Sequence, residues 1–307
     1  MMRKEILLPG LALTGGVIGA ALRRWALTAA FEPDTGLAIA THPAMLALTA
    51  FTAAIVLALA LLCRACPVKL ADASYHKAFY APEMPLPVIS QAAAVVLGLS
   101  AILLLSEVPP LYLSRLTELE LDGYVGPNQL RSFLFAAPEL AQSLLGLAAA
   151  VSLFFAARGL AGEGGKLGFG TTVLLPGFYT CIWLINAYRD LATDPVILAY
   201  FWHLLAIIAV VLALYYAAGF SYQNVRPRLT LFFSLLGVFS CLTTLPDPHS
   251  LVELLALAAF LLWLTAASIA LLRNLLGLPH TAPPKQAPPR PKPLPTDDED
   301  DDVDIVL

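Results

Sequence analysis

Long apolar segments separated by short polar ones run along most of the 307-residue chain. Most are about as long as the roughly 20 residues that an α-helix needs to cross a hydrocarbon core. In lipid such segments must be helical, because unpaired backbone groups would find no water there. The pattern predicts an all-α polytopic transmembrane helix bundle of about eight spans, at about 5–22, 43–63, 87–106, 137–157, 170–188, 195–220, 229–245 and 250–272.

Composition supports this fold class. Hydrophobic residues make up 59% of the chain and charged residues only 13%, whereas soluble domains carry about 25% charged residues. An ordinary water-soluble globule is therefore excluded, and the lipid bilayer is the expected environment. The net charge is −4, and the Lys and Arg residues are spread out rather than gathered in a basic stripe, so we expect no nucleic-acid partner.

The first apolar segment has two interpretations. Arg3 and Lys4 precede it, and the small residues Gly19, Ala20 and Ala21 lie near its end, as in a cleavable signal peptide. Against cleavage, Gly15 and Gly19 form a small-residue face suited to close helix packing. The run is also longer than a usual signal-peptide core, so we favour a retained helix. Arg23 and Arg24 are then expected just beyond its end, on the outer side.

Basic residues predict the orientation. If the N-terminus lies inside, the cytoplasmic segments hold thirteen of the eighteen Lys and Arg residues, and such loops are normally enriched in them. Both termini are therefore expected in the cytoplasm.

The C-terminal segment differs in composition from the rest. Residues 279–295 contain eight prolines, and residues 297–304 contain seven acids, a composition typical of disorder. We therefore divide the chain into a transmembrane helical domain, residues 1–275, and a disordered cytoplasmic tail, residues 276–307. The tail could recruit a cytoplasmic protein partner.

Several polar side chains fall near or within the predicted spans, all in the outer half of the membrane under this orientation. Ionisable groups at membrane depth are costly and usually face the bundle interior, which makes them functional candidates. Structural ion pairs and hydrogen bonds are the favoured interpretation of these residues, with a ligand or ion site as the alternative. As a site hypothesis, one outward-opening cavity would gather Arg23, Arg24, Glu139, Gln142, Asn186, Arg189, Asp190, His203 and Glu253.

No motif points to a catalytic residue, a metal or a cofactor. The pair Cys63 and Cys66 stands alone as a CxxC, without a second pair or a nearby pair of histidines. The chain has no His-x-x-x-His, Glu-x-x-His or serine-hydrolase motif, so an intramembrane enzyme is the least favoured class. The loop at residues 162–171 resembles a phosphate loop but lacks its glycine and Lys-Ser/Thr spacing, and is interpreted as a turn.

The longest predicted outer loop is residues 109–136. Leu111, Tyr112, Leu116 and Leu119 recur near helical spacing there, with charged residues between them. We expect a short amphipathic helix lying in the membrane interface.

Three stretches carry a resemblance: AFEPDTGL at 30–37, PGFYTCIWLINAYRDLATDP at 176–195 and LALYYAAGFSYQ at 212–223. They resemble uncharacterised multi-pass membrane proteins of Gram-positive bacteria, a group with no assigned activity. The resemblance implies a bacterial cell membrane location and supplies no site residue. Two functions are favoured from the residues: an outward-facing binder, sensor or transporter of an unknown small ligand, and a membrane scaffold acting through the acidic tail.

Overall fold

A computed structural model describes residues 4–32, 37–39, 41–66, 75–82, 85–123, 126–161, 172–191 and 196–278. These residues form an all-α protein, apart from one isolated antiparallel bridge between Phe31 and Ala38. The helices are α1 (Lys4–Ala29), α2 (Pro43–Arg64), α3 (Tyr75–Ala78), α4 (Leu86–Leu121), α5 (Asn128–Leu160), α7 (Leu174–Leu191), α8 (Ile197–Gly219), α9 (Pro227–Thr244) and α10 (Leu251–Leu275).

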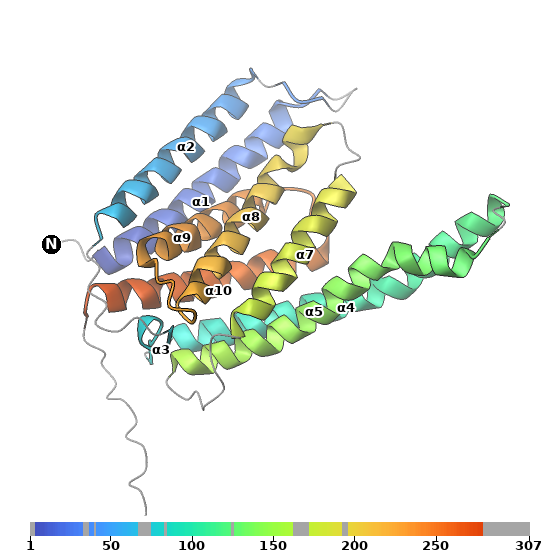
Figure 1. Ribbon diagram of the computed structural model, residues 1–307. Helices are drawn as coiled ribbons and strands as arrows, with labels where there is room; N and C mark the ends of the chain where they lie inside the picture. Colours follow the sequence, from blue (N-terminus) through green and yellow to red (C-terminus); the bar gives the residue numbers. More distant parts are fainter. Residues whose placement is uncertain are drawn as a thin grey trace, which may run out of the picture.

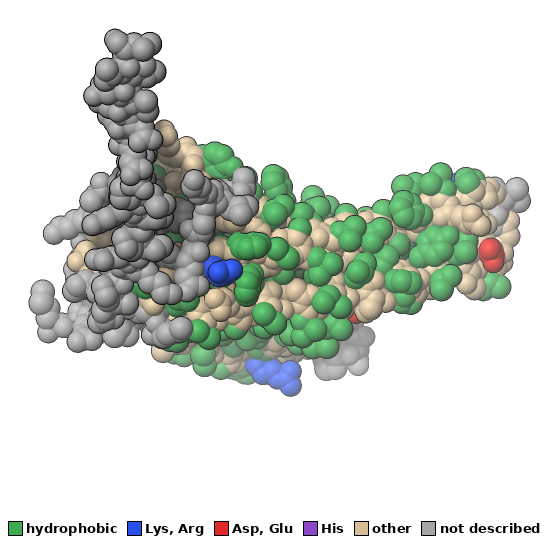
Figure 2. Space-filling model, turned by 90° about the horizontal axis from the view of Figure 1, so that it is seen from below, with side chains coloured by type: hydrophobic (Ala, Val, Ile, Leu, Met, Phe, Trp, Pro, Cys, Tyr) green, Lys and Arg blue, Asp and Glu red, His purple; other side chains and the backbone are tan. Residues whose placement is uncertain are grey.

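The long helices lie side by side in a bundle, and α4 and α5 form a hairpin that extends past the others (Figure 1). Large side chains fill the interior, among them Trp263, Phe239 and Phe260. Apolar side chains also cover much of the outer surface (Figure 2), where Val95 and Ile185 are about two-thirds exposed, at 66% and 65%. A surface of this kind suits lipid rather than water.

Six helical segments are long and apolar enough to cross a membrane: Pro43–Arg64, Leu86–Leu121, Asn128–Leu160, Tyr200–Gly219, Pro227–Thr244 and Leu251–Leu275. They identify a multi-pass integral membrane protein. The helices α1 and α7 correspond to the two other predicted spans but do not belong to this set. Both carry strongly polar residues, Arg23 and Arg24 in α1 and Arg189 in α7.

Helix α1 ends later in the sequence than the first predicted span, 5–22. The helix continues to Ala29, so that Arg23 and Arg24 lie within it and not beyond it. The expectation that these arginines follow the helix was wrong. Arg23 is fully buried and paired with Asp247, which allows a charged residue to sit inside the packed part of the helix.

Residues 109–121 are helical, but the prediction of a separate short helix within 109–136 was wrong. The helix α4 continues through Pro109 and Pro110 to Leu121, and α5 begins at Asn128. Each proline removes one backbone donor and would be expected to break a helix. Here α4 and α5 run alongside each other over this length (Figure 1), and packing against α5 holds α4 helical past both prolines.

The small-residue face of α1 is used for packing, as predicted. A Cβ atom built on Gly16 would lie 2.7 Å from Cβ of Leu242 in α9, and one on Gly19 would lie 2.5 Å from Oγ1 of Thr243. The glycines therefore let α1 and α9 approach more closely than side chains would permit.

The helix ends define two ends of the bundle. We call the end where α1, α7 and α9 finish and α8 and α10 begin the polar end. The predicted tail lies outside the described residues from position 279 onward, and the predicted turn at 162–171 also lies outside them.

Candidate functional site

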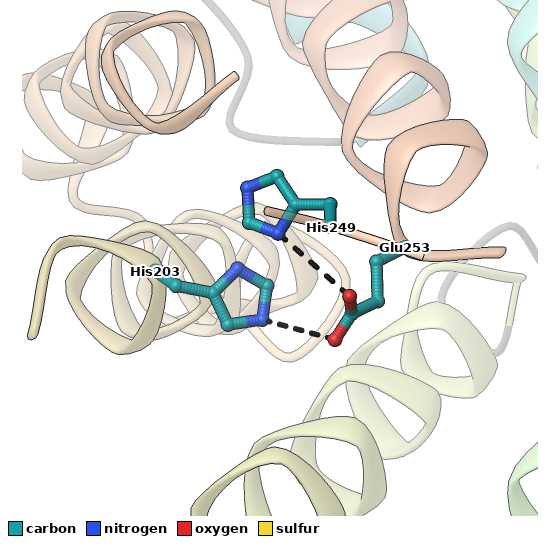
Figure 3. A group of neighbouring side chains, drawn as sticks. All are labelled: His203, His249 and Glu253. Carbon is teal, nitrogen blue, oxygen red and sulfur yellow. Dashed lines mark ion pairs between the residues drawn. The ribbon is translucent and has the colours of Figure 1, made fainter. Parts of the chain in front are cut away.

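The polar end carries a cluster of two imidazoles and one carboxylate: His203 in α8, His249 in the α9–α10 connection and Glu253 in α10 (Figure 3). His203 Nε2 lies 3.6 Å from Glu253 Oε1, and His249 Nδ1 lies 3.7 Å from Glu253 Oε2. The two imidazole ring centroids are 4.6 Å apart. Both rings therefore approach the same carboxylate from separate segments of the chain.

The start of α10 positions Glu253. The Ser250 side chain accepts a hydrogen bond from the Glu253 backbone N–H at 3.2 Å, and Glu253 Oε2 accepts one from the Ser250 N–H at 2.9 Å. This reciprocal pair is a capping box, which supplies partners for the free amide groups at the start of a helix. It holds one carboxylate oxygen and leaves Oε1 directed at His203.

The orientation of His249 follows from Thr244. His249 Nε2 lies 2.7 Å from the Thr244 backbone oxygen. A carbonyl oxygen can only accept, so Nε2 must carry the hydrogen, and Nδ1 of the neutral ring has the lone pair. That lone pair faces Glu253, which is also an acceptor, so the contact is satisfied either by a proton on Nδ1 or by a cation between the two groups.

His203 has no such backbone contact. The residue is buried, at 3% exposed, and neither ring nitrogen has a hydrogen-bond partner among the described residues. Trp183 of α7 meets the ring edge-on at 5.9 Å between centroids, and Phe260 stacks on Trp183. A buried polar group without a partner costs free energy, so His203 is the side chain in the cluster that most needs a ligand.

A second group at the polar end is the buried ion pair between Arg23 and Asp247. Arg23 Nε donates to Asp247 Oδ1 at 2.6 Å, and the two side chains are 0% and 4% exposed. The Thr244 hydroxyl donates to Asp247 Oδ2 at 2.7 Å. Since Thr244 also contacts His249, the ion pair and the imidazole cluster belong to one hydrogen-bonded network.

A third group joins α5 and α7. Arg189 forms an ion pair with Glu139, and Asn186 Nδ2 donates to Gln142 Oε1 at 2.7 Å. Asn186 also donates to the Pro138 carbonyl at 3.1 Å. Glu139 borders an open cleft of about 400 Å³ that Glu107 and Leu111 of α4 also line.

The predicted site residues thus fall into contact groups rather than one set of mutual contacts. Glu139 with Arg189 and Gln142 with Asn186 are pairs, while Arg23 and His203 with Glu253 belong to the network through Thr244. Arg24 is exposed, and the side chain of Asp190 lies outside the described ones. A single cavity shared by all nine stays a prediction.

Sequence reasoning missed His249, Thr244 and Asp247 as site residues. His249 and Glu253 are four residues apart, a spacing that brings two side chains together at a helix start, and this was the signal that could have found them. Thr244 offered no comparable signal, because its role depends on a backbone oxygen at the end of α9.

The ligand set of the cluster can hold a positively charged species. Glu253 supplies a carboxylate that is 31% exposed, while the two imidazoles are 4% exposed, so the cluster has one partly open side. Comparison with known proteins found no match: no protein-family model, no curated protein and no solved structure is similar to this chain.

Proposed function

We propose that this chain is an integral membrane protein of eight spans that binds a small cation at its polar end, which faces outward from a bacterial cell membrane. One observation carries the binding proposal: the buried imidazole of His203, without a hydrogen-bond partner among the described residues, stands opposite the partly exposed carboxylate of Glu253. Binding is the step that a sensor and a transporter share, and the proposal covers that step.

Electrostatics favours a cation over an anion. The cluster combines the Glu253 carboxylate with two imidazoles, and each ring can offer a nitrogen lone pair to a cation. The nearby positive charge of Arg23 is neutralised by Asp247 at 2.6 Å. A cation entering beside Glu253 therefore meets acceptors, whereas an anion would meet a carboxylate.

Eight spans are supported by the same ion pair. Charge lowers the hydropathy of α1, but Arg23 is buried against Asp247 rather than facing lipid, so hydropathy underestimates how well α1 suits a membrane. At about 1.5 Å per residue, α1 is long enough to cross a core of roughly 30 Å. The helix α7 packs between α5 and α8 (Figure 1), as an eighth span would.

The orientation is supported by the distribution of Lys and Arg, and the bacterial membrane by the resemblance of residues 176–195 and 212–223. The scaffold alternative depends on the tail, which lies outside the described residues.

Binding is tested on the purified full chain in detergent. The melting temperature is measured with a panel of small cations: alkali, alkaline-earth and transition-metal ions and short alkylamines. At least one class should raise the melting temperature of the wild type and raise that of Glu253→Gln less. If no cation stabilises the wild type, the binding proposal is wrong.

Orientation is tested by labelling single cysteines in intact cells with a membrane-impermeant maleimide, in a Cys181→Ala background because Cys181 is exposed. Leu251→Cys at the polar end should react in intact cells, and Tyr222→Cys at the opposite end only after permeabilisation. These side chains are 63% and 57% exposed, so the two sites are matched. The reverse pattern would place the polar end inside.

A further inference from the structure

We propose that His203, His249 and Glu253 form the binding site of one divalent transition-metal ion of the Zn²⁺ class. The inference deepens the proposed function and rests on it, since the same cluster at the polar end is the cation site. The three residues come from α8, the α9–α10 connection and α10.

The kinds of ligand select the class of metal. Imidazole nitrogens suit zinc, copper, iron and nickel, whereas calcium and magnesium prefer all-oxygen sites. Two imidazoles with one carboxylate are also a known ligand set of zinc sites that keep a position open. The cluster therefore fits a transition metal better than an alkaline-earth ion.

The spacing of the atoms agrees with this set. Bonds of about 2.0 to 2.2 Å in a tetrahedron place ligand atoms roughly 3.4 Å apart. The contacts of the two imidazoles with Glu253 are 3.6 and 3.7 Å, and all three ligand atoms lie within 4.8 Å of one another. The two contacts involve different oxygens of Glu253, so a bound metal would draw the three side chains closer together.

The surrounding hydrogen bonds match those of a metal site. A metal-bound histidine almost always gives its second ring N–H to a carbonyl or carboxylate, and a bound carboxylate is itself hydrogen-bonded. His249 Nε2 donates to the Thr244 carbonyl, which leaves Nδ1 for a metal, and Glu253 Oε2 accepts from Ser250. The free oxygen Oε1 faces His203 (Figure 3).

The burial of His203 provides an independent argument. In a purely structural cluster, at least one of its ring nitrogens would be expected to meet a hydrogen-bond partner. Both ring nitrogens are buried without a partner among the described residues. A metal bond to Nε2 would give one of them a partner. Trp183 and Phe260 close the apolar side, so the carboxylate of Glu253 marks the entry.

The test uses the purified full chain, freed of metal with a chelator and titrated with Zn²⁺ by calorimetry and with Co²⁺ by visible absorption. We expect one ion per chain and a Co²⁺ spectrum with tetrahedral or five-coordinate intensity. His203→Ala, His249→Ala and Glu253→Gln should each weaken binding by about tenfold or more. The matched control is His42→Ala, because His42, like His249, lies just before the start of a helix, where it accepts from the Ala44 N–H, but outside the cluster.

The titrations distinguish the metal site from its alternatives. Wild-type protein that binds neither metal, or variants that bind as tightly as the wild type, would overturn the proposal, and the cluster would then be a protonated ion pair. Stabilisation by Ca²⁺, Mg²⁺ or an alkylamine but not by Zn²⁺ would overturn the metal class and leave the small-cation function standing. If a variant is unfolded, X-ray absorption of the Zn²⁺-loaded wild type decides: two imidazoles support the site, and none overturns it.

Discussion

The polar end of the bundle and the distal part of the α4–α5 hairpin, residues 107–135, contain similar charged groups in opposite environments. Arg23 and Asp247 at the polar end are 0% and 4% exposed, whereas Arg115 and Glu118 in the hairpin are 40% and 60% exposed. Both are arginine–carboxylate pairs, at 2.6 and 2.8 Å. The chemistry is the same, and burial decides what each pair does for the protein.

Physically, the buried pair has lost its hydration and depends on its partner, while the exposed pair keeps water as an alternative partner. The hairpin pair lies on consecutive turns of one helix, and Arg115 also rests over the Phe135 ring at 5.3 Å. The polar-end pair joins residues 224 positions apart and ties α1 to the α9–α10 connection. Loss of one partner should therefore matter far more at the polar end.

The largest effect is expected for Asp247→Leu. It leaves the buried guanidinium of Arg23 without its carboxylate, and breaking a buried pair costs about 3 to 5 kcal/mol. The double variant Arg23→Met with Asp247→Leu should recover much of this loss. Thermal unfolding in detergent, monitored by a thiol dye that reports the buried cysteines, measures both. A single variant as stable as the wild type would show that the pair is not buried.

Packing provides the next contrast. Gly16→Ala places a Cβ 2.7 Å from Leu242, and overpacking of this kind costs about 1 to 3 kcal/mol. Gly126→Ala in the hairpin connection is the matched control, because a Cβ there meets nothing within 4 Å. Melting temperatures should fall for the first and stay within error for the second. Equal shifts would mean that α1 and α9 do not pack closely.

An intermediate effect is expected at the α5–α7 contact, where Glu139 and Arg189 are 15% and 39% exposed. Glu139→Gln removes the charge and keeps the shape. We expect a loss of about 1 kcal/mol, the upper end for pairs near a surface, measured by thermal unfolding. Raising the salt concentration should shrink the difference between wild type and variant, and a loss as large as that of Asp247→Leu would contradict this ranking.

The smallest effect is expected for Arg115→Ala in the hairpin. Exposed pairs three residues apart on a helix contribute roughly 0.2 to 0.5 kcal/mol, so the melting temperature should barely change. Glu118→Ala should behave in the same way. A large loss at either position would show that the distal hairpin is buried against something in the membrane-bound protein.

The helices followed from the sequence because each depends on a local property. A segment such as 43–63 is apolar over its length, and its helix α2 begins at Pro43 and ends at Arg64. Helix ends were less predictable where tertiary packing overrides a local signal. The sequence predicted a loop from residue 109, where two prolines occur, yet α4 passes through both because α5 lies beside it.

The candidate site divides in the same way. Polarity within or next to an apolar segment was enough to single out His203, Glu253 and Arg23, since a charge at membrane depth must be satisfied inside the fold. Their partners could not be inferred, because His203 and Glu253 are fifty residues apart in the sequence, and nothing local links them. The nine candidates were expected in one set; among the described side chains, Glu139 with Arg189 and Gln142 with Asn186 form pairs, while Arg23, His203 and Glu253 belong to one network through Thr244.

The sequence by itself determined that this is a helical membrane protein with polar residues at one end of its bundle. Hydropathy and helical periodicity are summed along the chain, and neither requires knowledge of neighbours. Only the tertiary structure decided that Asp247 neutralises Arg23 and that His249 turns its Nδ1 toward Glu253. Those outcomes depend on where α9 ends and how α8 and α10 pack. Contacts between side chains from different helices are set by their positions in space and not by their spacing along the chain.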